Sequence, residues 1–265
     1  MLDVAPEAAD VERRFSGLAR LYGAKAAQQI RAAHVVVVGV GGVGSWAAEA
    51  LARSGIGKLT LVDLDHIAES NINRQIHALT STLGQSKVLA MRERIAQINP
   101  DCEVRCIDAF VETGNWPAVA QFDAVADFGV SVLDACDQVK AKTAMAAWAI
   151  QANVNFITVG AAGGKRHGHK VDIEDLALVT HDPLLAQLRY RLRKEHRAPR
   201  KGKIGVSCVF SSESVMQPTM GSDHSAVDSN LNCHGYGSVV SVTATFGICA
   251  AGWLLDKIAS RSFAS

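Results

Sequence analysis

The sequence predicts an α/β fold with a doubly wound, mostly parallel sheet, helices on both faces and a C-terminal extension. Three observations predict it. Short apolar runs rich in β-branched residues alternate with stretches of helix-forming residues, a glycine-rich turn joins the first run to the first such stretch, and an aspartate ends the second run. Regular strand–helix alternation indicates parallel strands, because the crossover helices pack on the two faces of the sheet.

Each expected strand is a short apolar run bounded by polar or turn-forming residues, as is typical of buried parallel strands. The expected strands cover residues 34–39, 59–65, 104–108, 128–136 and 156–160. Helices are expected between them at 45–54, 84–98 and 139–152. The Asn99-Pro100 pair ends the second helix, because the residue before a proline disfavours helical backbone angles.

The character of the sequence changes after the fifth strand. Further strands are expected at 168–173 and 205–213. A helix is expected to start at Asp182-Pro183, since aspartate caps a helix N-terminus and proline suits the first helical position. The uncharged run at 239–255 is close to the minimum length of a membrane-spanning helix. Its serine, threonine and glycine residues favour a buried core or dimer helix instead, so membrane association is not expected.

Composition points to an ordinary globular protein. The 27 basic and 26 acidic residues give a net charge of +1, so any attraction to nucleic acid must come from a local basic surface. None of the six cysteines forms a C-x-x-C pair, which argues against a structural zinc site. The first residues include several acids rather than the pattern of a signal peptide, so a cytoplasmic location with free thiols is expected.

The glycine-rich turn predicts a Rossmann-like phosphate cradle. Gly39, Gly41 and Gly44 form G-x-G-x-x-G between an expected strand and an expected helix, with Gly42 in the same turn. Backbone N–H groups at such a helix start attract phosphates, and the absence of side chains lets the backbone approach them. Asp63 follows about twenty residues later, where a carboxylate binds a ribose hydroxyl. This motif alone leaves open an NAD-dependent oxidoreductase.

The polar residues that follow favour ATP chemistry over hydride transfer. An adenylation site needs cations that stabilise the phosphates while a carboxylate attacks the α-phosphorus, and a carboxylate that holds Mg²⁺ on the departing pyrophosphate. We expect Arg74 and Lys87 to supply the cations and Asp137 to serve catalysis and the metal. The nucleotide-binding residues expected beside them are Asp65, Asn71, Asn73 and Gln75.

Five segments carry a family resemblance. GVGGVG (39–44), LVDLD (61–65), SNINRQ (70–75), LGQSK (83–87) and DACDQV (134–139) resemble, in order and spacing, the ThiF–MoeB or ubiquitin-activating-enzyme-like superfamily. The resemblance implies that Asp63 binds the ATP ribose, that Arg74 and Lys87 contact the phosphates and that Asp137 serves the metal. It also implies a homodimer in which an N-terminal arginine reaches the partner's ATP. The aligned position here is Gly17, so we expect the neighbouring Arg20 to take that role.

Other segments narrow the resemblance. RFSGLARLYG, GVGGVGSWAAEALARSGIG, NRQIHAL and KGKIGVSCVFSSE resemble the tRNA threonylcarbamoyladenosine dehydratases over nearly the whole chain. The resemblance implies that ATP activates the threonyl carboxylate of N6-threonylcarbamoyladenosine at tRNA position 37, after which a ring closes with net loss of water. The alternatives are adenylation of a ubiquitin-like sulfur-carrier C-terminus, an NAD-dependent oxidoreductase, and a non-enzymatic nucleotide-dependent RNA-binding module.

A basic segment is the expected tRNA contact. Eight lysines and arginines lie between positions 189 and 203, with Glu195 the one acid among them. Four-residue spacing places three of the arginines on one helix face, opposite a leucine stripe. Such a surface suits the phosphate backbone of RNA. The expected tRNA-binding residues are Arg189, Arg193, Arg197, Lys201 and Lys203.

We divide the chain into an N-terminal helical arm (1–33), an ATP-binding Rossmann-like domain (34–165) and a substrate-binding, tRNA-binding and dimerisation extension (166–265), packed as one unit. The loop at 160–168 lies where it can admit the substrate's carboxylate, and its Lys165 and Arg166 are expected to face RNA. Cys233 is a candidate reactive thiol beside His234, although a structural role or the docking of a sulfur-transfer partner, such as a cysteine-desulfurase system, is favoured.

Overall fold

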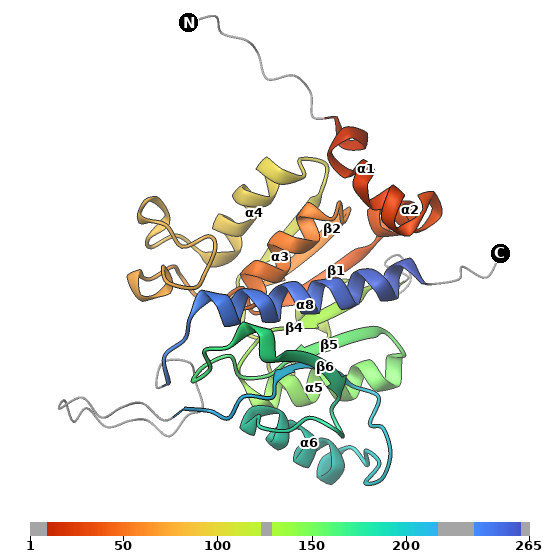
Figure 1. The fold of residues 1–265 in the computed structure, drawn as a ribbon, viewed down its shortest axis with the longest axis vertical. Coiled ribbons are helices and arrows are strands. Elements are labelled where there is room, and N and C mark those ends of the chain that lie inside the picture. The colour runs from red at the N-terminus through yellow and green to blue at the C-terminus, as the bar shows by residue number, and fades with distance from the viewer. Residues whose placement is uncertain (1–9, 123–128, 217–235, 261–265) are drawn as a thin grey trace, which may run out of the picture.

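The computed structural model describes residues 10–122, 129–216 and 236–260, and it contains one seven-stranded sheet with the order β3-β2-β1-β4-β5-β7-β6 (Figure 1). All neighbouring strands pair in parallel except β6 and β7, which are antiparallel. The strands are β1 (His34–Val38), β2 (Lys58–Val62), β3 (Glu103–Ile107), β4 (Ser131–Asp134), β5 (Asn155–Val159), β6 (Val171–Asp175) and β7 (Ser207–Ser211). The predicted doubly wound, mostly parallel sheet is confirmed.

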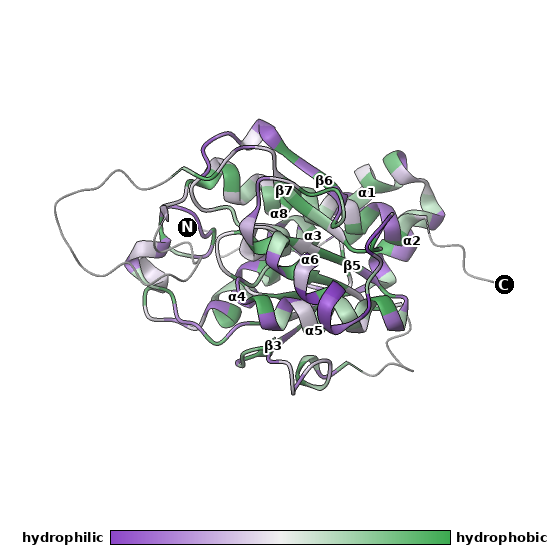
Figure 2. Ribbon diagram, turned by 90° about the horizontal axis from the view of Figure 1, so that it is seen from below, coloured by the Kyte–Doolittle hydropathy of each residue, from purple (hydrophilic) through white to green (hydrophobic). Residues whose placement is uncertain are grey.

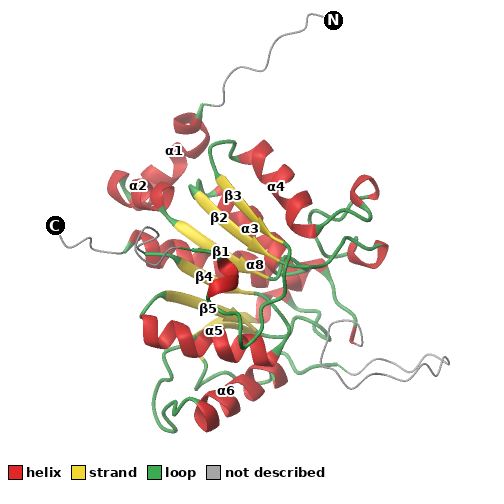
Figure 3. Ribbon diagram, turned by 180° about the vertical axis from the view of Figure 1, so that it is seen from behind, coloured by secondary structure: helices red, strands yellow, loops and turns green. Residues whose placement is uncertain are grey.

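Helices cover both faces of this sheet. The α-helices are α1 (Val11–Tyr22), α2 (Ala24–Ala32), α3 (Gly44–Arg53), α4 (Lys87–Ile98), α5 (Val139–Ala152), α6 (Pro183–Glu195) and α8 (Val240–Ala259). Short 3₁₀ helices are η1 (Glu69–Asn71), η2 (Thr80–Thr82), η3 (Ala118–Ala120) and η4 (Gly168–Lys170). The helices α3, α4 and α8 pack on one face, whereas α5 and α6 pack on the other, as the view from behind shows (Figure 3).

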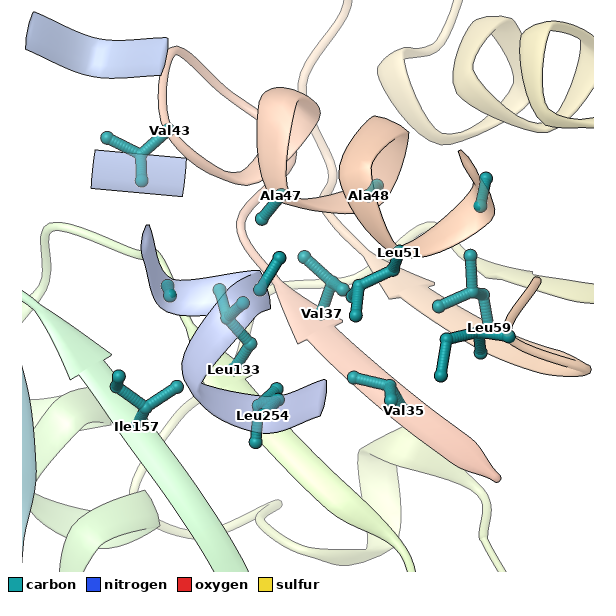
Figure 4. Packing of buried hydrophobic residues seen from close by; sticks show 14 of the residues in the cluster. Val35, Val37, Val43, Ala47, Ala48, Leu51, Leu59, Leu133, Ile157 and Leu254 are labelled. Atoms are coloured by element: carbon teal, nitrogen blue, oxygen red, sulfur yellow. The ribbon is translucent and has the colours of Figure 1, made fainter. Parts of the chain in front are cut away.

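Alternation along the strands feeds two hydrophobic cores. Val35 and Val37 of β1 point into the core shared with α3 and α8, and Val36 and Val38 point into the core shared with α5 and α6. Successive side chains of a strand point to opposite faces, so every residue of a strand that is covered on both sides must be apolar or paired. Figure 4 shows part of the first core, in which Leu51 of α3 and the two β1 valines belong to one cluster of buried side chains. Figure 2 shows hydrophobic segments gathered where helices meet the sheet.

The long apolar helix α8 lies across the sheet next to α3 (Figure 1). The two helices approach so closely that a Cβ on Gly247 would lie 2.4 Å from the Val43 carbonyl oxygen. In the described part of the chain, α8 is the one helix long and apolar enough to cross a membrane, and half of its apolar window is buried inside the protein. Its packing against α3, β5 and α2 accounts for this composition as that of a core helix.

Differences from the predicted elements are local and have physical causes. β2 stops at Val62 rather than residue 65, because the Asp63 side chain bonds the amides of Val40 and Asp65 and turns the chain away from the sheet. The strand predicted at 168–173 starts later, since residues 168–170 form η4. The start of α6 is as predicted, with Asp182 Oδ1 accepting from the Leu185 amide at 3.0 Å and Pro183 in the first turn.

Candidate nucleotide-binding site

A crevice opens at the carboxyl ends of the parallel strands, where the strand order reverses between β1 and β4. Ligands of doubly wound folds bind at this switch point, because the turns after adjacent strands diverge there. The turns after β1, β2, β3, β4 and β5 all contribute to its lining. The structure brings together, in this one lining, the predicted residues Gly39, Gly41, Gly42, Asp63, Asp65, Arg74, Gln75, Lys87 and Asp137.

The glycines of the turn have different tasks. Gly39 has φ 84°, and a Cβ there would lie 2.9 Å from the Ala135 backbone. A Cβ on Gly44 would lie 1.7 Å from the Gly39 carbonyl oxygen, so this glycine is needed for helix–strand packing and does not line the crevice. A Cβ on Gly41 would meet only the Gln75 Nε2 atom, at 3.8 Å. The described protein therefore leaves space above Gly41.

Asp63 fixes the loop after β2 around the mouth of the crevice. Its Oδ2 accepts from the Val40 amide at 2.6 Å, and its Oδ1 accepts from the Asp65 amide at 2.9 Å. Burial raises the pKa of Asp63, while the Lys87 charge and the two amide hydrogen bonds act against that rise. The carboxylate thus joins the glycine turn to the β2 turn and keeps lone pairs for a further donor.

Two positively charged side chains, Lys87 and Arg74, line the crevice, and hydrogen bonds within the protein fix their orientation. The Lys87 Nζ lies 2.7 Å from Asp65 Oδ2, with the lysine side chain 7% exposed and the aspartate 54% exposed. The Arg74 guanidinium donates to the Ser70 carbonyl at 2.7 Å, and the backbone carbonyl of Arg74 accepts from Trp46 Nε1 at 2.9 Å. Both positive side chains are therefore oriented before any ligand arrives, which reduces the reorganisation that charge stabilisation would require.

The turn after β4 supplies an exposed carboxylate. Asp137 lines the crevice and is exposed, whereas Asp134, the last residue of β4, is completely buried. Cys136 lies between them, and burial followed by the Asp134 charge raises the pKa of its thiol well above the ordinary value. Its thiol is therefore poorly suited to act as a nucleophile. Within residues 10–122, 129–216 and 236–260, no group of three or more potential ligands could hold a metal by itself.

Comparison with known proteins decides the family. A model described as the ThiF family matches residues 15–261. The chain belongs to the ThiF family. Within it, the chain is 44% identical to the tRNA threonylcarbamoyladenosine dehydratase of Escherichia coli K12, over 94% of this chain and 95% of that one. The predicted resemblance is confirmed, including its narrower form.

Solved structures agree with this assignment. The E. coli tRNA N6-threonylcarbamoyladenosine dehydratase in complex with ATP matches with a TM-score of 0.81 and 44% identity, covering 93% of this chain and 94% of that one. The same E. coli enzyme in complex with AMP matches with a TM-score of 0.81 over the same shares of both chains. Those complexes hold ATP and AMP on a fold that this ThiF-family chain shares.

Some predicted residues of this ThiF-family chain lie outside the crevice lining. The Asn71 Oδ1 accepts from the Ala68 amide and the Asn73 side chain donates to the Ser238 carbonyl, so both shape the loop that carries Arg74. Arg20 is exposed on α1, with its guanidinium near the Ser16 hydroxyl. It does not line its own chain's crevice, and its role toward a partner subunit stays a prediction.

Sequence reasoning missed part of the lining. The missed residues are 109–111, which follow β3, and Leu184 and Thr243, which come from α6 and α8. Residues 160–162 belong to the loop that was expected at the crevice, and they do line it. The position of residues 109–111 after a strand could have predicted their place, because each strand that ends at this edge of a parallel sheet brings its next residues near the crevice. The contributions of α6 and α8 had no such sequence signal, because they depend on how distant helices pack.

The basic segment differs from its prediction in detail. The helix α6 ends at Glu195, and Arg197 has a left-handed φ of 57°, so the expectation that it shares a helix face with the two preceding arginines was wrong. The Arg189 Nη1 atom donates to the carbonyls of Leu176 and Val179, which uses this guanidinium inside the fold. Arg197, Lys201 and Lys203 are exposed.

Lys165 was expected to face RNA, and this expectation was wrong. Its side chain is completely buried, and its Nζ donates to the Ser211 carbonyl at 3.1 Å and lies 4.0 Å from Asp182. Asp182 also accepts from the Ala161 amide, so this buried group braces the loop after β5. Arg166 is exposed. Cys233 lies outside the described residues.

Proposed function

We propose that this chain is an ATP-dependent tRNA threonylcarbamoyladenosine dehydratase that binds ATP in the crevice above its glycine turn. One observation carries the proposal: the space over Gly41 is bordered by Arg74, Lys87 and Asp137, two cations and a carboxylate drawn from three separate segments of the chain. A hydride-transfer site has no need of this combination. The family assignment and the ATP-bound E. coli relative support the same reading.

The residues present fit ATP. The phosphates would lie over the backbone N–H groups of the glycine turn, where the α3 N-terminus also favours negative charge. Asp63 would accept from a ribose hydroxyl. The buried Gln75 Oε1 has no partner among the described residues, and it lies in the crevice lining where a ligand group can reach it. The apolar side chains of Val62 and Phe110 in the same lining would receive the base.

Asp137 fits a site for Mg²⁺ that phosphates would complete. Magnesium in nucleotide sites is usually held by one or two carboxylates together with substrate phosphates and water. When bound, Mg²⁺ neutralises charge that develops on the departing pyrophosphate. Arg74 and Lys87 would act in the same sense from other segments of the crevice lining. Asp65 keeps the Lys87 ammonium directed at the crevice until phosphate oxygens compete for it.

The reaction divides into two displacements. An oxygen of the threonyl carboxylate attacks the α-phosphorus, and pyrophosphate leaves. The carbamoyl oxygen or nitrogen of the same modified nucleoside then attacks the activated carbonyl, AMP leaves, and the ring closes. The oxygen lost as water ends on AMP. Neither displacement requires a covalent cysteine, which agrees with the raised pKa of the Cys136 thiol in the crevice.

The substrate tRNA would lie along the basic segment. Arg197, Lys201 and Lys203 form the part of it most suited to phosphates, since the guanidinium groups of Arg189 and Arg193 donate to backbone carbonyls within the fold. We further propose a homodimer in which Arg20 reaches the partner's ATP, a cytoplasmic location and, around Cys233, the docking of a sulfur-transfer partner. These proposals follow the family resemblance rather than contacts within this chain.

The deciding experiment is pyrophosphate release from ATP and Mg²⁺. It is measured with threonylcarbamoylated tRNA, with a ubiquitin-like sulfur carrier, and with neither. Release that depends on the modified tRNA, with the cyclic nucleoside detected by mass spectrometry, supports the proposal. Release that depends only on the carrier protein would overturn it in favour of a sulfur-carrier adenylating enzyme.

A further inference from the structure

Two lysines are the largest completely buried side chains in the described part of the protein, Lys142 and Lys165. Lysine is almost never fully buried without a partner, because removing its charge from water is costly. Lys165 braces the loop after β5. Lys142, on α5, lies behind the turn that carries Asp137. Neither the predicted site nor the proposed reaction uses Lys142.

The Lys142 ammonium has a complete set of partners. Its Nζ donates to Asp134 Oδ2 at 3.0 Å, to Thr158 Oγ1 at 3.0 Å and to the Val159 carbonyl at 2.9 Å. These three bonds use all three of its hydrogens. Burial by itself lowers the pKa of Lys142, but the Asp134 carboxylate more than offsets this effect and the pKa is raised. Lys142 is therefore a buried cation that joins α5 to β4 and β5.

The paired carboxylate controls the direction of the next turn. Asp134 Oδ1 accepts from the Cys136 amide at 3.1 Å, which folds the backbone back on the end of β4, and from the Cys136 thiol at 3.0 Å. Asp134 Oδ2 also accepts from the Thr158 hydroxyl at 2.6 Å. The residues that follow, 135–138, all line the crevice. The same turn packs directly against Gly39, where a Cβ would lie 2.9 Å from the Ala135 backbone.

We propose that Lys142 is a positioning residue for the reaction: its ion pair with Asp134 holds the turn at 135–138 so that Asp137 faces the phosphates of ATP. This inference rests on the proposed function, which gives Asp137 its role. The glycine turn, Arg74 and Lys87 lie on other segments, so ATP still binds when the pair is removed. A displaced Asp137 then slows the chemical step and weakens the effect of Mg²⁺ on ATP binding.

The test removes both charges together in Lys142→Met/Asp134→Asn, because removing one would leave the other buried and unpaired. We expect kcat for pyrophosphate release to fall on the order of 10- to 100-fold, as misplacement of a reacting group by about 1 Å can cost. The KM for ATP at saturating Mg²⁺ should change by less than about threefold. The Mg²⁺ concentration at half-maximal rate should rise several-fold.

A control replaces another buried carboxylate and one of its cations. The Glu49 side chain of α3 is 6% exposed, and it pairs with Arg94 of α4 at 2.7 Å and with Arg53 at 2.8 Å, away from the turn at 135–138. Glu49→Gln/Arg94→Met should keep kcat within about twofold of the wild type, even if its melting temperature falls as far as that of Lys142→Met/Asp134→Asn. Thr158→Val removes the hydroxyl that Asp134 and Lys142 share. It should shift kcat and the Mg²⁺ requirement in the same direction as the double variant Lys142→Met/Asp134→Asn, but by less. It therefore tests the inference even if the double variant does not fold.

Calorimetry of ATP binding with and without Mg²⁺ gives a readout that does not depend on turnover. At a Mg²⁺ concentration that half-saturates the wild type, the wild type should bind ATP more tightly than without Mg²⁺, and Lys142→Met/Asp134→Asn should lose most of that difference. A folded double or Thr158→Val variant with wild-type kcat and wild-type Mg²⁺ dependence would overturn the positioning role. If the wild type released no pyrophosphate with any substrate, the proposed function would fail. The calorimetric comparison would still test whether Lys142 supports Mg²⁺-dependent ATP binding.

Discussion

Gly44 lies so close to Gly39 that a Cβ on the first would stand 1.7 Å from the carbonyl oxygen of the second. The start of α3 is thus packed directly on the end of β1. A methyl group there cannot be accommodated without moving backbone, and overpacking of this kind costs on the order of 3 kcal/mol or more. Gly44→Ala should therefore lower the free energy of unfolding strongly, measured by chemical denaturation.

Gly41 gives the opposite expectation within the same motif. A Cβ at this position meets only Gln75 Nε2, at 3.8 Å, which is an ordinary contact. Gly41→Ala should leave the melting temperature near that of the wild type but weaken ATP binding by about tenfold or more, equivalent to about 1.4 kcal/mol, because the methyl group projects toward the phosphates. Unchanged ATP affinity in calorimetry would place the phosphates elsewhere.

Removing the charges that face the crevice should stop adenylation without unfolding the protein. Arg74→Ala and Asp137→Ala should each lower kcat/KM for pyrophosphate release by on the order of 10²- to 10³-fold, as the loss of one preorganised charge contact does. Both side chains have solvent-accessible surface, so circular dichroism and melting should stay close to wild type. The exposed Arg92 and Asp101 serve as controls for the same substitutions. Near-normal turnover of either crevice variant contradicts the assignment.

The sequence predicts best those features that depend on residues close to one another in the chain. Strand positions and the capped start of α6 were predicted well, since alternation, capping and turn residues act over a few neighbours. The crevice residues that were predicted belong to short segments of contiguous sequence, such as the one holding Arg74. Leu184 and Thr243 were missed, because they enter the crevice only through the packing of separate helices.

The expectations for Lys165 and Arg189 show what a charge pattern leaves out. Both were taken as surface residues, yet the Lys165 side chain is completely buried against Asp182, and the Arg189 guanidinium bonds two backbone carbonyls, while its contact with tRNA stays a prediction. A charge pattern cannot show which cations are bonded inside the fold. The predicted roles of Arg20 and Cys233 depend on other chains or on residues outside the described ranges, and they stay predictions.

The exposed part of the basic segment should carry the salt dependence of tRNA binding. Each lysine or arginine that neutralises a phosphate contributes roughly one to the slope of log K against log salt. The triple variant Arg197→Ala/Lys201→Ala/Lys203→Ala should reduce this slope by about 2–3 in filter-binding assays over a salt series. Arg189→Ala should instead lower the melting temperature, because it leaves the carbonyls of Leu176 and Val179 without their donor. An unchanged slope in the triple variant would place the RNA on another surface.

His77 should make the protein sensitive to mild acid. Its ring is 2% exposed, and neither ring nitrogen has a hydrogen-bond partner among the described residues. Burial first, and then the charges of Lys87 and Arg94, lower its pKa from 6.5 to about 4. Between these values the unfolded chain binds a proton that the folded protein does not. Stability from this group is therefore complete above pH 6.5 and is lost as the pH falls toward 4, by roughly 3 kcal/mol.

A single substitution isolates this effect. His77→Leu removes the titrating group, so its free energy of unfolding should fall less than that of the wild type between pH 6.5 and 4, by roughly 3 kcal/mol at the acid end. Burial raises the pKa values of Asp63 and Asp182, which acts in the opposite direction, but both carboxyls remain in the two proteins and largely cancel in the difference. The exposed His196, changed to leucine, is the control and should leave the pH profile unaltered. Parallel profiles for wild type and His77→Leu in urea titrations would show that His77 is protonated in the folded protein, contrary to the lowered pKa.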